Sequence, residues 1–363
     1  MNVGLRVLDG VIEGGILGLL VTAPLPFGGV DLWAQSAIEA AVVGLVALVV
    51  ARQVLGGTLF LRWSPLLGPA LLITAVSAAQ LAIGTSVNPH ATFGSMRLLV
   101  AYWGFLVVVS LHLTTRGRVL RLLWTVVATG MGLAVLGLAN RAAGRALAPW
   151  FPPDFPVTRL TSTFVNPNHQ ALYFAITALL AAALLLRPRA GAEARSGRGA
   201  HRTPRSPGRL TRIVLLMGAI AVMTVALVLT FSRGGVIGLV AGLAVALAAS
   251  LRGRRATVVL GLVGGVGAVA LVVLQVVGNG ALLNRFGTLG REPFAEYRWT
   301  VWERTVRMLG EAPLTGVGLG AFQDAFPMYR PPGIESDKFI DHAHNDYLEL
   351  GAEAGFPGLI AAG

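Results

Sequence analysis

Long apolar runs recur along this chain, and they constrain its fold more than any other feature. A helix needs about 20 apolar residues to cross a bilayer, and most of the runs approach that length. The chain is 55% hydrophobic and only 13% charged, whereas soluble domains carry roughly 25% charged residues. The sequence therefore predicts an all-α, polytopic integral membrane protein with about ten transmembrane helices. The runs cover 9–23, 34–51, 66–83, 98–113, 119–138, 169–186, 213–230, 235–250 and 257–277, and a tenth begins near Tyr347.

The distribution of basic residues predicts how these helices are oriented. Arginines concentrate in one alternate set of loops, which includes the segment 187–212. Cytoplasmic loops are the ones enriched in Lys and Arg, so we expect the N-terminus in the cytoplasm and the long loop 278–346 outside. The same loops account for the net charge of +12, and we expect no nucleic-acid partner.

Three parts follow from this topology. Residues 1–277 form the transmembrane bundle, 278–346 the large external loop, and 347–363 the start of a further transmembrane helix. The basic segment 187–209 is either a disordered cytoplasmic loop that fixes the topology or a contact to anionic lipid headgroups. The acids in the first turns favour a retained N-terminal helix over a signal peptide. The absence of cysteine excludes thiolate catalysis, thiolate metal sites and disulfides.

The long external loop contains one clear helical pattern. Apolar and aromatic residues repeat at helical spacing over 296–309, which predicts an amphipathic helix on or near the membrane surface. The following glycines, Gly316, Gly318 and Gly320, imitate part of a dinucleotide fingerprint. No strand or βαβ pattern surrounds them, so we discard that interpretation.

Polar residues gather in four places that this topology assigns to one external face. Segments about 150 residues apart would meet there, as expected of an active site built between helix ends. The four are "RLTSTFVNPNHQ" (159–170), "TFSRGG" (230–235), Arg298 on the loop helix, and "DHAHNDYLE" (341–349).

Each of these clusters has a structural and a functional interpretation. Arg233, between two apolar runs, is either an interfacial arginine whose head reaches water or a ligand for phosphate oxygens. Asn166 and Asn168 flank Pro167 and favour a turn into the helix 169–186, with Asn168 as its N-cap. A helix N-terminus facing outward can also receive an anion, so both roles are compatible.

The two histidines of "DHAHNDYLE" leave three alternatives. His342 and His344 could hold a metal together with Asp341 and Asp346, although on a helix this spacing turns the two rings apart. The segment could also be only a polar helix start, anchored at the interface by an aromatic residue. The third alternative is that one histidine acts as a general base, a role that suits a near-neutral imidazole.

Several motifs together resemble a known family. "STFVNPNH" (162–169), "FSRGG" (231–235), the segment 297–322 and "HAHNDYLELGAEAGFPG" (342–358) occur in the order seen in the O-antigen ligase and O-antigen polymerase-like superfamily. "PLPFGGVDLW" (24–33) also looks like many members, so the resemblance extends along the whole chain. Members usually continue beyond the histidine motif, and we therefore expect this chain to be C-terminally truncated.

The resemblance implies a GT-C-like membrane glycosyltransferase of the bacterial inner membrane, with its active site facing the periplasm. Such enzymes move a glycan from undecaprenyl diphosphate to an acceptor hydroxyl, on lipid A-core or on another glycan or protein, without a metal or other cofactor. The family histidine falls on His344, and the family arginines on Arg298 and Arg233. The expected substrate contacts are Asn345, His342, Asn168, Asn166 and Arg159.

Other functions stay open at this point. An O-antigen polymerase or a protein O-oligosaccharyltransferase would use the same chemistry. A secondary transporter or lipid-linked oligosaccharide flippase is the alternative from another class. Such proteins place ionisable residues near the bilayer midplane, where this chain is apolar.

Overall fold

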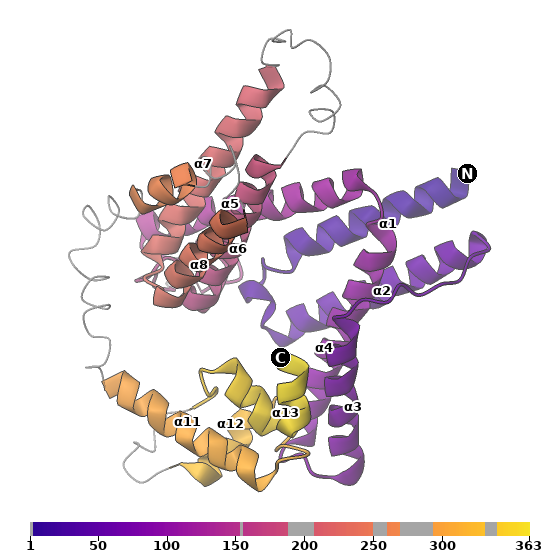
Figure 1. Ribbon diagram of the computed structural model, residues 1–363, viewed down its shortest axis with the longest axis vertical. Helices are drawn as coiled ribbons and strands as arrows, with labels where there is room; N and C mark the ends of the chain where they lie inside the picture. Colours follow the sequence, from indigo (N-terminus) through magenta and orange to yellow (C-terminus); the bar gives the residue numbers. More distant parts are fainter. Residues whose placement is uncertain (1–2, 153–154, 188–206, 250–259, 269–292, 331–339) are drawn as a thin grey trace. The chain divides into compact units, whose positions relative to one another are not determined.

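The computed structural model describes the chain except for residues 1–2, 153–154, 188–206, 250–259, 269–292 and 331–339. Most of the described residues are helical (Figure 1), and β structure among them is one isolated bridge between Arg145 and Pro156. The all-α prediction is therefore confirmed for this part of the chain. The chain divides into two compact units, which are described separately below.

The first unit combines Met1–Ile16, Gln35–Thr114 and Thr288–Gly363. It contains the larger part of α1 (Val3–Thr22) and α2 (Leu32–Leu55), then α3 (Leu67–Ile83) and α4 (Pro89–His112). Its C-terminal helices are α11 (Pro293–Glu311), α12 (Phe322–Ala325), the 3-10 turn η2 (Phe326–Tyr329) and α13 (Asp346–Ala362). Helix α13 packs against both α3 and α11, and α3 packs against α4.

The second unit combines Leu17–Ala34 with Thr115–Gly287. Its helices are α5 (Arg116–Ala143), α6 (Pro167–Leu186), α7 (Pro207–Leu229) and α8 (Arg233–Ala249), with the short turn η1 (Phe27–Gly29). These two units are not the three parts that the topology predicts, and the division at 277 and 346 stays a prediction. Much of the basic loop and the stretches 278–292 and 331–339 lie outside the described residues.

Eight of the predicted apolar runs coincide with α1 to α8, and the largest difference is at α4. That helix begins nine residues before the apolar run because Asn88 caps it, accepting the Ala91 N–H at 3.1 Å, and Pro89 occupies its first position. Only 260–268 of the ninth run is described, and it is helical. The tenth run corresponds to α13.

Five described helices are long and apolar enough to cross a membrane. They are α2, α4, α5, α6 and the part Leu210–Leu229 of α7, while α3 and most of α8 are shorter apolar helices. The chain therefore has the character of a multi-pass membrane protein. The number of about ten helices, the GT-C-like class and the periplasmic position of the loop stay predictions.

Charged residues within the apolar helices of the first unit form pairs. Arg52 on α2 bonds to Asp9 on α1 at 2.9 Å, and Arg97 on α4 bonds to Glu39 on α2 at 2.8 Å. An ionisable group in an apolar surrounding is costly unless it has such a partner. These pairs explain how acids can stand inside the N-terminal helices.

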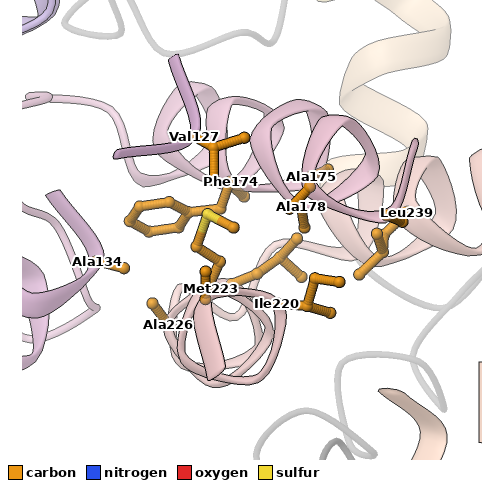
Figure 2. Close-up of a cluster of buried hydrophobic side chains, with 14 of the residues drawn as sticks. Val127, Ala134, Phe174, Ala175, Ala178, Ile220, Met223, Ala226 and Leu239 are labelled. Atoms are coloured by element: carbon orange, nitrogen blue, oxygen red, sulfur yellow. The ribbon is translucent and has the colours of Figure 1, made fainter. Parts of the chain in front are cut away.

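Small residues allow the helices of the second unit to pack closely. Ala175 and Ala178 on α6 lie against Ile220, Met223 and other residues of α7 (Figure 2). A methyl group added at Gly235 on α8 would lie 2.6 Å from the Ala171 side chain on α6. Such close approach through glycine and alanine is typical of helix packing in membranes.

Helix α13 is bent rather than straight. Gly355 has φ 66° and ψ −163°, and Pro357 follows two residues later. A methyl group at Gly355 would lie 2.6 Å from the Pro313 carbonyl oxygen, so the bend brings α13 against the loop after α11. The bend fixes the N-terminal half of α13, and with it the histidine segment, in the first unit.

Candidate active site

The histidine segment His342–Asn345 lies directly before α13. Asn345 caps this helix, because its side-chain oxygen accepts the Leu348 N–H at 3.2 Å. The segment therefore is a polar helix start, as one of the three interpretations proposes, but its other contacts go well beyond a cap.

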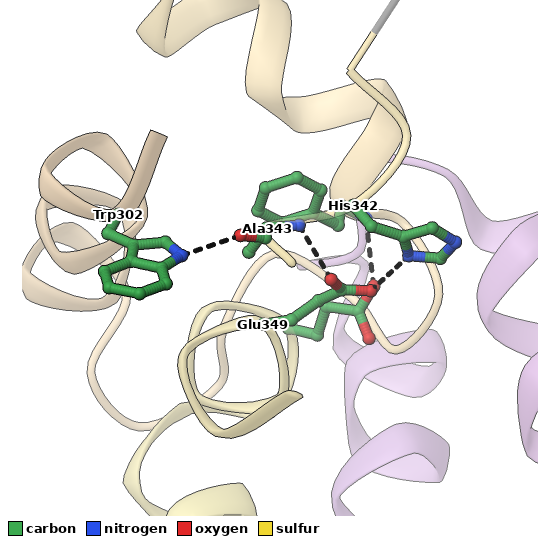
Figure 3. Close-up of polar contacts among 6 residues, drawn as sticks. Trp302, His342, Ala343 and Glu349 are labelled. Carbon is green, nitrogen blue, oxygen red and sulfur yellow. Dashed lines mark hydrogen bonds and ion pairs between the residues drawn. The ribbon is translucent and has the colours of Figure 1, made fainter. Parts of the chain in front are cut away.

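Glu349, in the first turn of α13, bonds to two residues of the histidine segment. One carboxylate oxygen lies 2.6 Å from His342 Nδ1, and the other accepts the Ala343 N–H at 2.8 Å (Figure 3). The indole N–H of Trp302 on α11 donates to the Ala343 carbonyl at 2.9 Å. Both backbone polar groups of Ala343 are thus bonded to side chains from two different helices.

His344 has a backbone conformation that is rare for a residue with a side chain. Its φ is 55°, in the left-handed region, where a residue other than glycine costs about 1–3 kcal/mol. Ala343, directly before it, is completely buried in a cluster with Val301, Met308 and Phe322. The packing and the bonds to Ala343 over-determine this conformation, which is the situation in which strain persists at functional sites.

The two histidines differ in charge. The hydrogen bond to Glu349 raises the pKa of His342 to about 9, so its ring is an imidazolium at neutral pH. The pKa of His344 is lowered below its usual 6.5, first because neighbouring protein removes part of its hydration and then because Arg298 repels a proton. His344 is therefore a neutral imidazole that can accept a proton.

Arg298 lies on the exposed side of α11. The predicted amphipathic helix over 296–309 is confirmed, with α11 extending from Pro293 to Glu311. Its buried residues Val301, Thr305 and Met308 face the interior of the first unit, and Trp299 stays 69% exposed. The apolar side of this helix thus packs in the protein core, which is a different use from the contact with a membrane surface that the pattern predicts.

Three glycines after α11 form a loop that packs against α13 in the first unit, called the glycine loop below. Gly316, Gly318 and Gly320 have φ of 66°, 117° and 74°, which side chains rarely adopt. A methyl group at Gly316 would lie 2.3 Å from the Glu353 backbone, and at Gly318 it would lie 2.5 Å from Ser86. The spacing that imitates a nucleotide motif therefore serves close packing of backbone on α13 and on the start of α4.

The side chain of Gln80 on α3 fixes the position of the glycine loop by hydrogen bonds. Its side-chain amide donates to the carbonyl oxygens of Thr315 and Glu353 and accepts the Leu319 N–H at 3.2 Å. The Glu353 carboxylate accepts the Phe322 N–H at 3.1 Å. Both side chains are buried, so these bonds hold α3, the glycine loop and α13 together.

The other four predicted residues belong to the second unit. Arg159 donates to Asn168 at 3.0 Å and to the Thr230 carbonyl at 2.7 Å. The N-cap of α6 is Asn166 and not Asn168 as predicted, because the helix already begins at Pro167 and Asn166 accepts the Asn168 N–H at 2.8 Å. Arg233 begins α8, whose first turn touches the first turn of α6 at Gly235. The clusters 159–170 and 230–235 are thus brought together as predicted. Their meeting with His344 and Arg298 stays a prediction.

Sequence reasoning missed Glu349 and Trp302. An acid four residues after a helix cap was the only signal for Glu349, and a tryptophan on a half-buried helix gave none for its bond to Ala343. The metal alternative gains no support, because the described residues hold no group of three or more His, Asp or Glu side chains suited to a metal ion.

The fold and the polar segments define a multi-pass helical membrane protein with a histidine site before α13. Residues 218–363 match the family model of Wzy_C, described as O-Antigen ligase. The match includes the arginine motif, α11, the glycine loop and the histidine segment, so the resemblance is confirmed there. No curated protein and no solved structure matches the chain. Members are glycosyltransferase- or ligase-like enzymes of glycan transfer related to O-antigen and lipopolysaccharide.

Proposed function

We propose that this protein transfers a glycan from an undecaprenyl-diphosphate carrier to an acceptor hydroxyl at the periplasmic face of the bacterial inner membrane. The observation that carries the proposal is the state of His344. It is a neutral imidazole held in a left-handed conformation beside an arginine. A general base must be unprotonated at the working pH and fixed within reach of the proton it removes.

The reaction is a single displacement. His344 takes the proton of the acceptor hydroxyl as the oxygen attacks the anomeric carbon of the donor glycan. The bond from that carbon to the diphosphate oxygen breaks, and its electron pair leaves with the carrier diphosphate. The configuration of the anomeric carbon is therefore inverted.

Arginines stabilise the charge that develops on the leaving diphosphate. Arg298 and Arg233 are the two assigned to this role, since a guanidinium offers a planar fork to phosphate oxygens and stays charged. Arg159, Asn166 and Asn168 contact the carrier or its glycan, with the α6 N-terminus favouring an anion. His342 and Asn345 contact the substrate beside His344. Glu349 orients the His342 ring, and Asn345 also caps α13.

The test is a His344→Ala variant assayed with undecaprenyl-diphosphate-linked glycan in proteoliposomes that contain an acceptor such as lipid A-core. Transfer should fall by about 10²–10⁴-fold, the usual contribution of a general base. Membrane insertion should stay unchanged, with His90→Ala on α4 as a matched control. An active His344→Ala protein would remove the base from the proposal.

Three enzyme activities share this chemistry and differ in their acceptor. A ligase modifies lipid A-core, a polymerase extends the glycan, and a protein O-oligosaccharyltransferase modifies Ser or Thr. Glycolipids and glycoproteins of a deletion strain distinguish them. Movement of lipid-linked oligosaccharide across proteoliposomes without any acceptor would instead favour a flippase.

A further inference from the structure

A pocket of about 440 Å³ opens beside the histidine segment, entirely within the first unit. Its walls come from α3, α4, the glycine loop with α12, and α13. Ligand sites commonly enclose about 300–1,000 Å³ and combine an apolar lining with a few polar groups. The polar side chains in the walls are Ser95, Tyr102, Gln323, Asp341, His342, Glu349 and Glu353.

His342 connects this pocket to the candidate base. Its ring extends from Glu349 on the side opposite to Trp302 (Figure 3), and it lines the pocket together with Glu349. Because Nδ1 is bonded to Glu349, the second ring nitrogen is the atom that a ligand would meet. His344 follows two residues later and is not among the lining residues, but its charge interacts with those of His342 and Glu349. A ligand bound to His342 therefore lies near the segment that carries the proton acceptor.

The charge of the walls limits what can bind. Three acidic residues line the pocket, namely Asp341, Glu349 and Glu353, against the single basic residue His342. Carboxylate oxygens accept hydrogen bonds from hydroxyl and ammonium groups, and they repel phosphate. This composition disfavours the donor diphosphate, for which Arg298 and Arg233 carry the opposite charge.

The apolar walls suit the other face of a sugar ring. Ile73 on α3 and Leu98 and Leu99 on α4 also line the pocket. A pyranose has a rim of hydroxyl groups and a face of C–H groups. It can therefore bond to Glu349 and Gln323 with its rim while the face lies on the leucines.

We propose that this pocket binds the acceptor sugar that carries the attacking hydroxyl, and that it selects neutral or amino sugars over phosphorylated ones. The inference rests on the proposed function, and it adds a substrate class to the same site. It also explains why His342 is held as a charged pair instead of serving as a second base.

Leu99→Trp tests the inference by filling the pocket. Val100→Trp, one position along α4, is the matched control because its side chain is 38% exposed and does not line the pocket. Binding of methyl glucoside, glucosamine and glucose 6-phosphate to the full chain in nanodiscs is measured by saturation-transfer NMR. Gln323→Trp, at an exposed position of α12, provides a second filled pocket should Leu99→Trp fail to fold.

Methyl glucoside and glucosamine should bind to the wild type and to Val100→Trp. Filling the pocket should weaken both by about tenfold, the effect of roughly 1.4 kcal/mol. Glucose 6-phosphate should bind least. Equal binding to the filled variants, or strongest binding of the phosphorylated sugar, would overturn the proposal.

A transfer assay distinguishes failure of this inference from failure of the proposed function. If the wild type transfers glycan but the filled variants bind sugar and use acceptor as well as it does, the pocket assignment is wrong and the function stands. If the wild type binds sugar yet transfers nothing from the lipid-linked donor, the function fails and the acceptor assignment fails with it.

Discussion

The two units of this chain hold their polar groups in different ways. In the first unit, the histidine segment has no regular structure and is fixed by side chains from two helices, Trp302 and Glu349. In the second unit, polar residues cap a helix or bond to carbonyl groups, as Asn166 and Arg159 do. A residue other than glycine has left-handed backbone at His344 in the first unit and at Phe27 and Phe231 in the second, so strain does not separate the units. The difference lies in the bonds, which join two helices around Ala343 in the first unit and stay near helix ends in the second.

This difference separates two kinds of chemistry. The charge of a histidine depends on its neighbours, and here one ring is protonated and the next is neutral. Arginine stays charged at every working pH. Substitutions in the first unit should therefore change the rate and its pH dependence. In the second unit, substitutions of Arg159, Asn166 and Asn168 should change the affinity for the anionic donor, whereas substitution of Arg233, assigned to the leaving diphosphate, should change the rate without its pH dependence.

Among the residues around the candidate base, the largest effect is expected from Arg298→Gln. Loss of a cation at the leaving group should lower the transfer rate by about 10²–10³-fold. Because Arg298 lowers the pKa of His344, its removal should also move the acid limb of the pH–rate profile to higher pH.

Arg307→Gln is the control on the same helix, since Arg307 forms an exposed pair with Glu311. Rates of both variants are measured from pH 5 to 9. An acid limb that stays in place in Arg298→Gln would contradict the electrostatic link to His344.

The helices could be predicted from sequence because each leaves a local signal. Apolar runs located α1 to α8 within a few residues, and the helical spacing of 296–309 located α11. The start of α4 was predicted nine residues too late. Its first turns are polar, so the apolar run does not include them, and the cap Asn88 lies before the run. The inward packing of α11 could not be predicted, since an amphipathic pattern does not say which surface covers the apolar side.

The site was predictable in its residue types and not in its geometry. The motif "HAHN" predicted a histidine site. The conformation of His344 and the different charges of the two rings depend on contacts with residues distant in the sequence. Glu349 and Trp302 reach Ala343 from different helices, and periodicity carries no information on such a meeting. The pattern of the three glycines did not predict a nucleotide site. That their backbone packs on Glu353 could not be predicted from the sequence and is seen only in the structure.

Glu349→Gln should give the second largest effect, a loss of about tenfold in rate. Gln keeps the shape but loses the charge that holds His342 and Ala343, and a charge-assisted hydrogen bond contributes about 1.5–3 kcal/mol. The pKa of His342 should fall from about 9 toward its usual 6.5. NMR titration of the His342 ring checks this directly.

The same pair links stability to pH. The folded pKa of His342 is raised, so its contribution is complete below 6.5 and is lost as the pH rises to about 9. The thermal midpoint of the wild type should fall over this window, and that of Glu349→Gln should fall less. Glu311→Gln, which removes a carboxylate bonded to Arg307 and Tyr329, should retain the wild-type slope above pH 6.5.

Trp302→Phe should have a smaller effect, about three- to tenfold in rate. The ring stays, but the Ala343 carbonyl loses its donor, and a neutral hydrogen bond contributes about 0.5–1.5 kcal/mol. Trp299→Phe is the control, because Trp299 is exposed on the same helix. An equal loss in both variants would show that ring packing, and not the bond to Ala343, positions His344.

The smallest effect is expected in the second unit, from Arg159→Lys. The charge is kept, but a lysine cannot bond to the Thr230 carbonyl and to Asn168 with the same planar fork. The KM for the lipid-linked donor should rise by about two- to fivefold, with kcat and the pH profile unchanged, because no titrating group is altered. Arg141→Lys, which bonds to the Thr158 carbonyl in the same unit, is the control. A change in kcat or in either pH limb would mean that Arg159 also shapes the reacting groups, and its assignment to donor binding alone would then be wrong.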